Sequence, residues 1–189
     1  MNYTIRKAQP NDSAKIAQLM FYAMEDIVFD FLGQKNEDKA IRFLEELIEQ
    51  NNNQYSFENT FVLEIENNIA ASFTLYDGGN LEKLRENVLT HLEKNYNRTI
   101  EPENETEAGE IYIDTIAVFP EYRGKGLGNI ILDYIIEEFA NKKGFVIGLL
   151  VDFTNPKAKK LYESKGFEVV GEKSLMSKNH EHMQYKKGV

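Results

Sequence analysis

A loop in which glycine alternates with other residues has the clearest chemical use in this sequence. It spans residues 123–128 (RGKGLG) and follows an apolar run at 111–118. Glycine lets the backbone come close to a ligand, and the unpaired amides at the start of a helix attract anions. The arginine and the lysine add positive charge. We therefore expect this loop to suit a pyrophosphate; the alternative is a glycine-rich turn that binds nothing.

Two common phosphate-binding motifs do not match this loop. A P-loop requires Gly-Lys followed by Ser or Thr, whereas Lys125 is followed by Gly126. The dinucleotide-binding fingerprint requires the spacing Gly-x-Gly-x-x-Gly, whereas Gly124, Gly126 and Gly128 are evenly spaced. Both motifs are therefore excluded.

The run His-Glu-His at 180–182 contains side chains that can bind metal ions. Two histidines separated by one residue in a polar tail are more often part of a solvated turn. The sequence also offers no third ligand beside them, and a metal site needs at least three. We therefore predict no metal site.

The chain that must position these residues has the size of one domain. Its 189 residues, of which 42% are hydrophobic, can fill one sizeable core. The net charge of −9 argues against nucleic-acid binding and favours cationic small molecules. The absence of cysteine excludes disulfides, thiolate metal sites and a cysteine nucleophile. No apolar run is long enough for a membrane span and the start lacks a signal-peptide core, so we expect a cytoplasmic protein without membrane association.

Hydrophobic periodicity and turn signals predict the elements of the N-terminal half. The Asn67-Asn68 pair is expected to form the turn of a hairpin. The acidic stretch at 101–110 is expected to be a flexible loop. The expected elements are a strand at 3–8, a helix ending near residue 32, a helix from about 36 to the polar run at 50–54, hairpin strands at 60–65 and 69–76, and a helix at 80–95.

The C-terminal half has the order strand, glycine loop, helix, strand, which is typical of an α/β unit. The run at 111–118 is almost wholly apolar and is expected in the interior of a sheet. The expected elements are that strand, a helix from the glycines to about 144, a strand at 145–151, a helix at 155–165, and closing strands at 167–170 and 183–187.

The glycine loop resembles the Arg/Gln-x-x-Gly-x-Gly/Ala loop of the GNAT N-acetyltransferases. Arg123, Gly126 and Gly128 match it directly after the Ile-Ala-Val-x-Pro-x-Tyr segment at 116–122. The resemblance extends through Asn-Pro-x-Ala-x-x-Leu-Tyr-x-x-x-Gly-Phe at 155–167 and covers most of the chain. It implies an α/β GNAT fold, in which helices flank a central mixed, mostly antiparallel sheet with a splayed pair of parallel strands.

The same resemblance implies a single domain over 1–189. Family members usually join the hairpin to the central strand by a short turn, so the segment 77–110 is interpreted as an insertion. It lies beside the expected acceptor mouth, where it could gate the mouth or recognise a cationic amine through acidic residues; a solvated appendage is the alternative. The acidic residues considered for this gating role are Glu101, Glu103, Glu105 and Glu107.

Acetyl-CoA is the co-substrate that the resemblance implies, with no metal. Its pantetheine arm would enter between the strands at 111–118 and 145–151 and pair with open backbone groups. The amide of Val118 would face the oxyanion. Asn155 would reach the pantetheine and can also cap the helix that begins at Pro156. The residues expected to bind the cofactor are Ile116, Ala117, Val118, Arg123, Gly124, Lys125, Gly126, Leu127, Gly128 and Asn155.

By resemblance, Tyr162 lies next to the thioester sulfur. It would donate a hydrogen bond or a proton as the CoA thiolate leaves. Transfer of a proton from a tyrosine of pKa about 10 to a thiolate of pKa about 8.5 is uphill by roughly 2 kcal/mol, so a hydrogen bond is the favoured description. The alternative is a core tyrosine beside Leu161.

The acceptor amine must lose a proton, because an amine of pKa about 10.4 is protonated at pH 7. Alternation predicts that Tyr112, Asp114, Ile116 and Val118 share one face of their strand, and the family often has Glu or His at positions matching Tyr112 or Asp114. Asp114 is the favoured base, since burial would raise its pKa toward a useful range. Orientation of a cationic substrate or a buried hydrogen bond are its alternative roles. Weaker candidates near the mouth are Glu110, Glu25 and Asp26.

These residues together predict an N-acetyltransferase. It would move an acetyl group from acetyl-CoA to a primary amine by direct attack in a ternary complex. The acceptor is expected to be cationic, either a small molecule such as a polyamine or a protein amine. A non-catalytic acyl-CoA-binding sensor is the alternative, and a protein-interaction module that lost its ligand is disfavoured by the intact loop. Assembly as a homodimer is left open.

Overall fold

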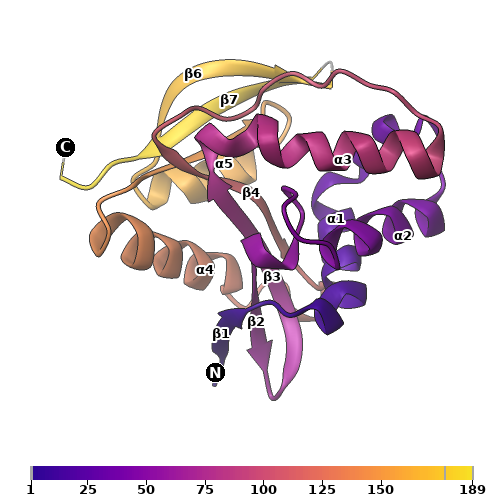
Figure 1. Ribbon diagram of the computed structural model, residues 1–189. Helices are drawn as coiled ribbons and strands as arrows, with labels where there is room; N and C mark the ends of the chain where they lie inside the picture. The colour runs from indigo at the N-terminus through magenta and orange to yellow at the C-terminus, as the bar shows by residue number, and fades with distance from the viewer. Residues whose placement is uncertain (1, 177, 189) are drawn as a thin grey trace.

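One seven-stranded sheet runs through the computed structural model, which describes residues 2–176 and 178–188 (Figure 1). The strand order is β1-β2-β3-β4-β5-β7-β6, and within the described chain only β4 and β5 run parallel. The mixed, mostly antiparallel sheet expected from the resemblance is confirmed. The strands are β1 (Thr4–Lys7), β2 (Thr60–Ile65), β3 (Asn68–Asp77), β4 (Glu110–Val118), β5 (Val146–Asp152), β6 (Glu168–Leu175) and β7 (Lys178–Tyr185).

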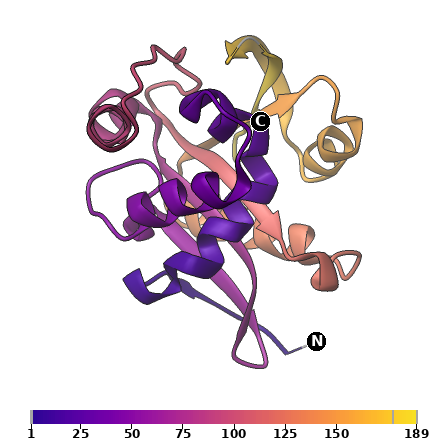
Figure 2. The ribbon, with the colours of Figure 1, turned by 90° about the vertical axis from the view of Figure 1, so that its right-hand side faces the viewer.

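Helices cover both faces of this sheet (Figures 1 and 2). One buried cluster joins α1, α2 and α3 to one face, and a second joins α4 and α5 to the other. None of the helices in residues 2–176 and 178–188 has the length and apolar character needed to cross a bilayer. The helices are α1 (Ser13–Leu32), α2 (Glu37–Ile48), α3 (Leu81–Tyr96), α4 (Leu127–Ile135) and α5 (Pro156–Ser164).

Helix ends follow the local signals in the sequence. Helix α1 ends at Gly33, whose φ of +65° is the left-handed conformation that glycine adopts without strain. Helix α2 begins after Asn36, whose Oδ1 accepts a hydrogen bond from the Lys39 amide at 2.9 Å. Both boundaries agree with the sequence analysis.

The hairpin turn and the last two strands differ from expectation. The turn lies one residue earlier than predicted, because Glu66 and Asn67 adopt positive φ values of 50° and 63°, as a two-residue hairpin requires. Strand β6 continues to Leu175 and β7 begins at Lys178, whereas the expected strands covered only 167–170 and 183–187. Polar residues that carry no clear hydrophobic alternation occupy this part of the chain, so its strands were predicted too short.

The parallel pair β4 and β5 separates partway along its length. Pairing joins Glu110–Ile113 to Val146–Leu149, and in the described chain the ladder ends there. The remainder of β4, to Val118, and of β5, to Asp152, therefore diverges. The splayed strand pair implied by the resemblance is confirmed.

A bulge interrupts the pairing of β3 with β4 at Asp114. Leu75 lies opposite Ile113, and Thr74 lies opposite Thr115, so Asp114 is an extra residue on β4. An extra residue reverses the faces to which the following side chains point.

The prediction that Tyr112, Asp114, Ile116 and Val118 share one face of β4 is therefore wrong. Ile116 and Val118 pack against the cluster formed with α4, whereas Tyr112 packs with Tyr76 and Leu81 on the opposite face. Simple alternation could not anticipate this, because the bulge depends on pairing with β3.

The chain between β3 and β4 is anchored, contrary to the flexible loop predicted at 101–110. Glu105 and Thr106 are buried. The Thr106 hydroxyl donates to the Gly78 carbonyl at 2.6 Å, and Glu105 forms an ion pair with Arg85 of α3. These anchors are polar, so hydrophobic periodicity gave no sign of them.

Candidate active site

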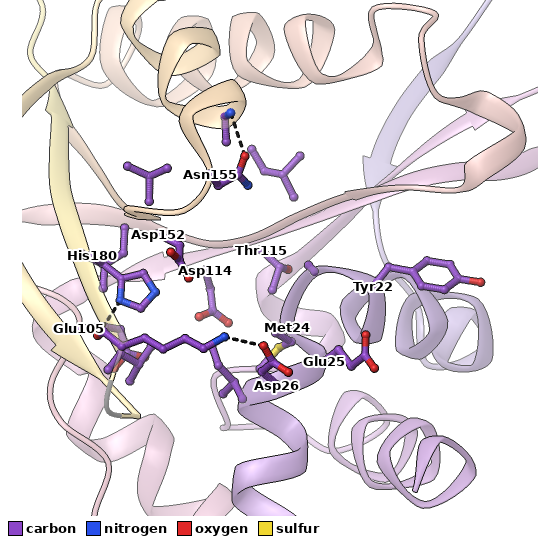
Figure 3. Close-up of a pocket in the computed structure, with 18 of the residues that line it drawn as sticks. Tyr22, Met24, Glu25, Asp26, Glu105, Asp114, Thr115, Asp152, Asn155 and His180 are labelled. Carbon is purple, nitrogen blue, oxygen red and sulfur yellow. Dashed lines mark hydrogen bonds and ion pairs between the residues drawn. The ribbon is translucent and has the colours of Figure 1, made fainter. Parts of the chain in front are cut away.

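A cavity of about 680 Å³ opens where β4 and β5 separate (Figure 3). It has walls on both sides of the sheet. We call the wall formed by residues 128, 132, 154, 155, 158, 161 and 162 the α5 half. We call the wall formed by residues 22–27, 31, 55, 85, 105, 112, 114, 175, 178 and 180 the α1 half.

The glycine loop leads into the α5 half. Gly124 and Gly126 have φ values of +74° and +80°, and a Cβ at either would meet nothing within 4 Å. Their backbone conformation, and not a lack of space, therefore demands glycine. Gly126 is the N-cap of α4 and provides no side-chain cap, so the first amides of the helix keep their donors for a ligand.

The two cations of this loop contact the residues just before it. The Arg123 Nε donates to the Val118 carbonyl at 3.0 Å. The ammonium of Lys125 lies 5.0 Å from the centre of the Tyr122 ring. Both cations thus stay at the loop, where they add to the positive potential of the helix start.

The structure brings together only part of the predicted cofactor-binding set. Ile116, Gly128 and Asn155 line the cavity. Ala117 points to the opposite side, against Leu19 and Phe119. The predicted residues that do not line the cavity are Ala117, Val118, Arg123, Gly124, Lys125, Gly126 and Leu127.

Asn155 caps the start of α5, and Tyr162 belongs to that helix. The Asn155 Oδ1 accepts from the Ala158 amide at 3.1 Å, which is the helix cap that the sequence analysis described. Its side chain also lines the cavity, as the Tyr162 side chain does. Burial raises the pKa of Tyr162 to about 12. Its hydroxyl therefore stays protonated and can serve as a hydrogen-bond donor.

Asp114 lies on the bulge and faces the α1 half. Its carboxyl lies at the centre of the cavity in Figure 3, and no described residue hydrogen-bonds to its buried Oδ2. Burial raises the pKa of Asp114 to about 8; the negative charge of Glu105 adds to the rise and the positive charge of Arg85 opposes it. An unpartnered carboxyl of this kind can exchange a proton with a ligand near neutral pH.

A buried ion pair between Arg85 and Glu105 lines the α1 half. The Arg85 and Glu105 side chains are 6% and 3% exposed and lie in direct contact. Arg85 also donates to the carbonyls of Pro102 and Glu103, at 3.3 and 3.0 Å. The helix and the loop of the 77–110 segment are therefore fixed to each other beside the cavity.

The acidic residues of that segment have different positions. Glu105 lines the cavity. Glu103 accepts from the Met176 amide at 3.0 Å, and Glu107 forms an ion pair with Lys173 at 3.2 Å. Of the four acids considered for recognition of the acceptor, Glu101, Glu103 and Glu107 do not line the cavity.

Charged residues from two distant segments meet at the mouth. The Lys178 Nζ of β7 lies 2.5 Å from the Asp26 Oδ2 of α1. Glu25 lies beside them (Figure 3). Glu110, proposed for the same region, lies elsewhere: its carboxylate is buried and accepts from His182 at 2.9 Å and Gln184 at 2.7 Å.

The His-Glu-His run at 180–182 is not the solvated turn that was predicted. It lies within β7, between β5 and β6, and His180 and His182 are 8% and 2% exposed. His182 binds Glu110, whereas His180 lines the cavity. The described residues contain no group of three or more His, Cys, Asp or Glu side chains placed to hold a metal ion.

Sequence reasoning missed Arg85, Tyr55, Lys178 and His180. One signal was available for Arg85. It shares the inward stripe of α3 with Leu81, Val88 and Leu92, and a charge on an apolar stripe indicates a buried partner. The other three reach the cavity through tertiary folding, and their neighbours in the sequence give no such sign.

Comparisons with known proteins agree with this geometry. Residues 21–167 match the model of the acetyltransferase (GNAT) family. No curated protein matched the sequence.

Solved structures of acetyltransferases have the same fold. One, described as an acetyltransferase, is 30% identical, with a TM-score of 0.81 and coverage of 98% of this chain and 100% of that chain. An N-acetyltransferase from Staphylococcus aureus Mu50 is 26% identical, with a TM-score of 0.85 and coverage of 96% and 100%. A putative acetyltransferase from Salmonella typhimurium with its cofactor acetyl-CoA is 17% identical, with a TM-score of 0.57 and coverage of 100% and 96%.

Proposed function

Because this chain belongs to the acetyltransferase (GNAT) family, whose members use acetyl-CoA, we propose that it acetylates a primary amine of a cationic acceptor. The acceptor is a small molecule such as a polyamine, or a protein amine. The acetyl group passes directly from acetyl-CoA to the amine while both are bound.

One observation carries this proposal. A single cavity joins the α5 half, with Tyr162 and Asn155, to the carboxyl of Asp114 through the gap between β4 and β5. A thioester in the gap would have a hydrogen-bond donor on one side and a proton acceptor on the other. Such an arrangement suits direct attack by an amine held next to the thioester.

The cofactor is proposed to bind mainly through backbone groups. The pyrophosphate sits at the start of α4, where Gly126 leaves the amides uncapped. The pantetheine lies along the unpaired part of β4 and reaches Asn155. The amide of Val118 is proposed to meet the oxyanion.

Asp114 is proposed to take a proton from the acceptor ammonium. Transfer from an amine of pKa about 10.4 to an ordinary aspartate would cost about 9 kcal/mol. With the pKa of Asp114 raised to about 8, the cost falls to about 3 kcal/mol. A bound cation favours the ionised carboxylate, which is the form of Asp114 that can accept a proton, and the pKa of Asp114 falls accordingly while the cation is bound.

Tyr162 is proposed to stabilise the leaving thiolate by a hydrogen bond. With its pKa raised to about 12, transfer of the proton to a thiolate of pKa about 8.5 would cost roughly 5 kcal/mol. A hydrogen bond to a charged group contributes about 1.5–3 kcal/mol without that cost.

Acetyl-CoA consumption against a panel of amines tests the proposal. The panel holds polyamines, amino acids, aminoglycosides and lysine peptides. Tyr162→Phe should lower kcat by about 10- to 100-fold with unchanged affinity for CoA. Tyr134→Phe, a partly buried tyrosine of α4 outside the cavity, is the matched control and should keep wild-type turnover. CoA binding without turnover on any amine would contradict acetyl transfer, and no binding of CoA would overturn the whole assignment.

A further inference from the structure

His180 is a titratable side chain in the cavity that the chemistry above does not use. It lies on β7, it is 8% exposed, and its ring lies beside Asp114 and Asp152 in Figure 3. Its position on the α1 half puts it on the side proposed for the acceptor.

The hydrogen bond of His180 fixes which ring nitrogen carries the proton. Nδ1 lies 3.1 Å from the backbone carbonyl oxygen of Lys178. A carbonyl can only accept, so Nδ1–H donates to it. In the neutral ring Nε2 therefore carries the lone pair, and no described residue hydrogen-bonds to it.

Asp152 is placed to stabilise the protonated ring. It is the direct cross-strand partner of His180 in the pairing of β5 with β7. Such partners have Cβ atoms about 4.5–5.5 Å apart. Hydrogen bonds from the hydroxyl and amide of Thr154, both 2.7 Å, hold the pKa of Asp152 below its usual range. Asp152 thus remains a carboxylate, and its negative charge lies directly across the strand pair from the His180 ring.

Acetylation of an ammonium removes two protons from the nitrogen. The first leaves before attack, to free the electron pair that forms the N–C bond. The second leaves after that bond forms. As the C–S bond breaks, the thiolate takes up one proton, and the other passes to solvent. One carboxyl group cannot hold both protons, so a second proton acceptor in the cavity has a clear use.

We propose that His180 is a second catalytic base, which accepts one of these protons at Nε2 while Asp114 accepts the other. This inference rests on the proposed function. The ionised Asp152 stabilises the imidazolium until its proton is released. The titratable and charged groups that share the cavity with His180 are Tyr22, Glu25 and Asp26 of α1, Tyr55, Arg85 of α3, Glu105, Tyr112 and Asp114 of β4, Asp152 of β5, Tyr162 of α5, and Lys178 of β7.

His180→Asn is the sharpest test, because the asparagine amide can replace Nδ1–H toward the Lys178 carbonyl while Nε2 is lost. We expect kcat on the accepted amine to fall about 10- to 100-fold, and the acid limb of the pH–rate profile to become shallower. KM for acetyl-CoA should not change. His91→Asn is the control, since His91 lies on α3 outside the cavity, with Nε2 2.9 Å from Glu46. It should keep both the rate and the profile.

The tautomer can be read without any activity. The chain has three histidines, so long-range 1H–15N spectra of the wild type and of H180N assign the His180 ring. We expect the Nδ1–H form when the ring is neutral. The Nε2–H form would overturn the inference. If the wild type is active and H180N has an unchanged kcat and pH–rate profile, the role of His180 is overturned while the proposed function stands. A wild type that acetylates no amine would overturn the proposed function and this inference with it.

Discussion

The two halves of the cavity are built in different ways. The α5 half comes from two stretches that are short in sequence, the glycine loop with the start of α4, and α5 itself. The α1 half comes from six separate parts of the fold: α1, the segment before β2, α3, the loop before β4, β4 itself and the β6–β7 hairpin. It is also the more charged half, with the Arg85–Glu105 and Asp26–Lys178 ion pairs.

This difference separates two kinds of binding chemistry. A ligand held by backbone amides needs a particular conformation, which Gly124 and Gly126 provide locally. A ligand held by side-chain charges needs charged groups whose pKa and interaction energy depend on how deeply they are buried and on the charges next to them. We therefore expect changes in the α1 half to couple strongly to stability, and changes in the glycine loop to act mainly on the cofactor.

The largest effect is expected from Arg85→Met. The substitution leaves Glu105 as a buried charge without its partner, which typically costs 3–5 kcal/mol. Urea unfolding should show a loss of that size. Arg42→Met is the matched control, because Arg42 pairs with Glu46 on the surface at 77% side-chain exposure, and its loss should lower stability far less. Equal losses for the two variants would break the contrast between a buried and a solvated pair.

The next effect concerns Asp114 and pH. Its pKa is about 8 in the folded protein and ordinarily 3.8, so between these values the folded state holds a proton that the unfolded state lacks. Folding stability contributed by this group therefore falls as pH rises from about 4 to about 8. Asp114→Asn removes that loss and should stabilise the protein by roughly 1–3 kcal/mol at pH 8.5, and by much less at pH 5.

Unfolding free energies at both pH values test this expectation. Asp38→Asn, on the exposed first turn of α2, is the control and should show no such dependence on pH. A stabilisation of D114N that is equal at pH 5 and pH 8.5 would mean that the raised pKa of Asp114 is wrong.

Gly126→Ala should affect the other half at a smaller cost. An alanine at φ +80° pays roughly 1–2 kcal/mol of backbone strain, although its Cβ meets nothing within 4 Å. Relief of that strain moves the amides at the start of α4, so calorimetry should show weaker CoA binding while KM for the amine is kept. Gly171→Ala, which has neither a positive φ nor a close neighbour, should leave both unchanged. A changed KM for the amine in G126A would show that the glycine loop also acts on the acceptor side, and would contradict the separation of the two halves.

The fold could be predicted largely from the sequence because its signals are local. Caps such as Asn36 and Asn155 and the left-handed Gly33 marked helix ends, and the apolar run of β4 marked the interior strand. The bulge at Asp114 was out of reach, since it is a property of the β3–β4 register. The order and the splay of the strands came from the family resemblance, not from periodicity.

The candidate site was predictable mainly in its α5 half; in the α1 half the sequence analysis named Asp114, Glu25, Asp26 and Glu105 but missed the other charged residues. Gly128, Asn155 and Tyr162 stand in continuous motifs and line the cavity as a group. His180 was taken for part of a solvated turn, because a polar strand lying between two others has no hydrophobic alternation that would reveal its burial. Charged residues that become neighbours only through folding form no motif of fixed spacing in the sequence, so the sequence alone could not group them.

Asp26→Asn should give the smallest effect and the finest test of the contrast. The Asp26–Lys178 pair is exposed at the mouth, so its loss should cost less than about 0.5 kcal/mol of stability. The missing carboxylate weakens the attraction of a cationic acceptor, and KM for the amine should rise about 2- to 5-fold at low salt, with the difference vanishing at high salt. Asp30→Asn, exposed on the same helix but outside the cavity, should leave KM as it is. A change in KM for acetyl-CoA in D26N would show that charge at this mouth acts on the cofactor as well.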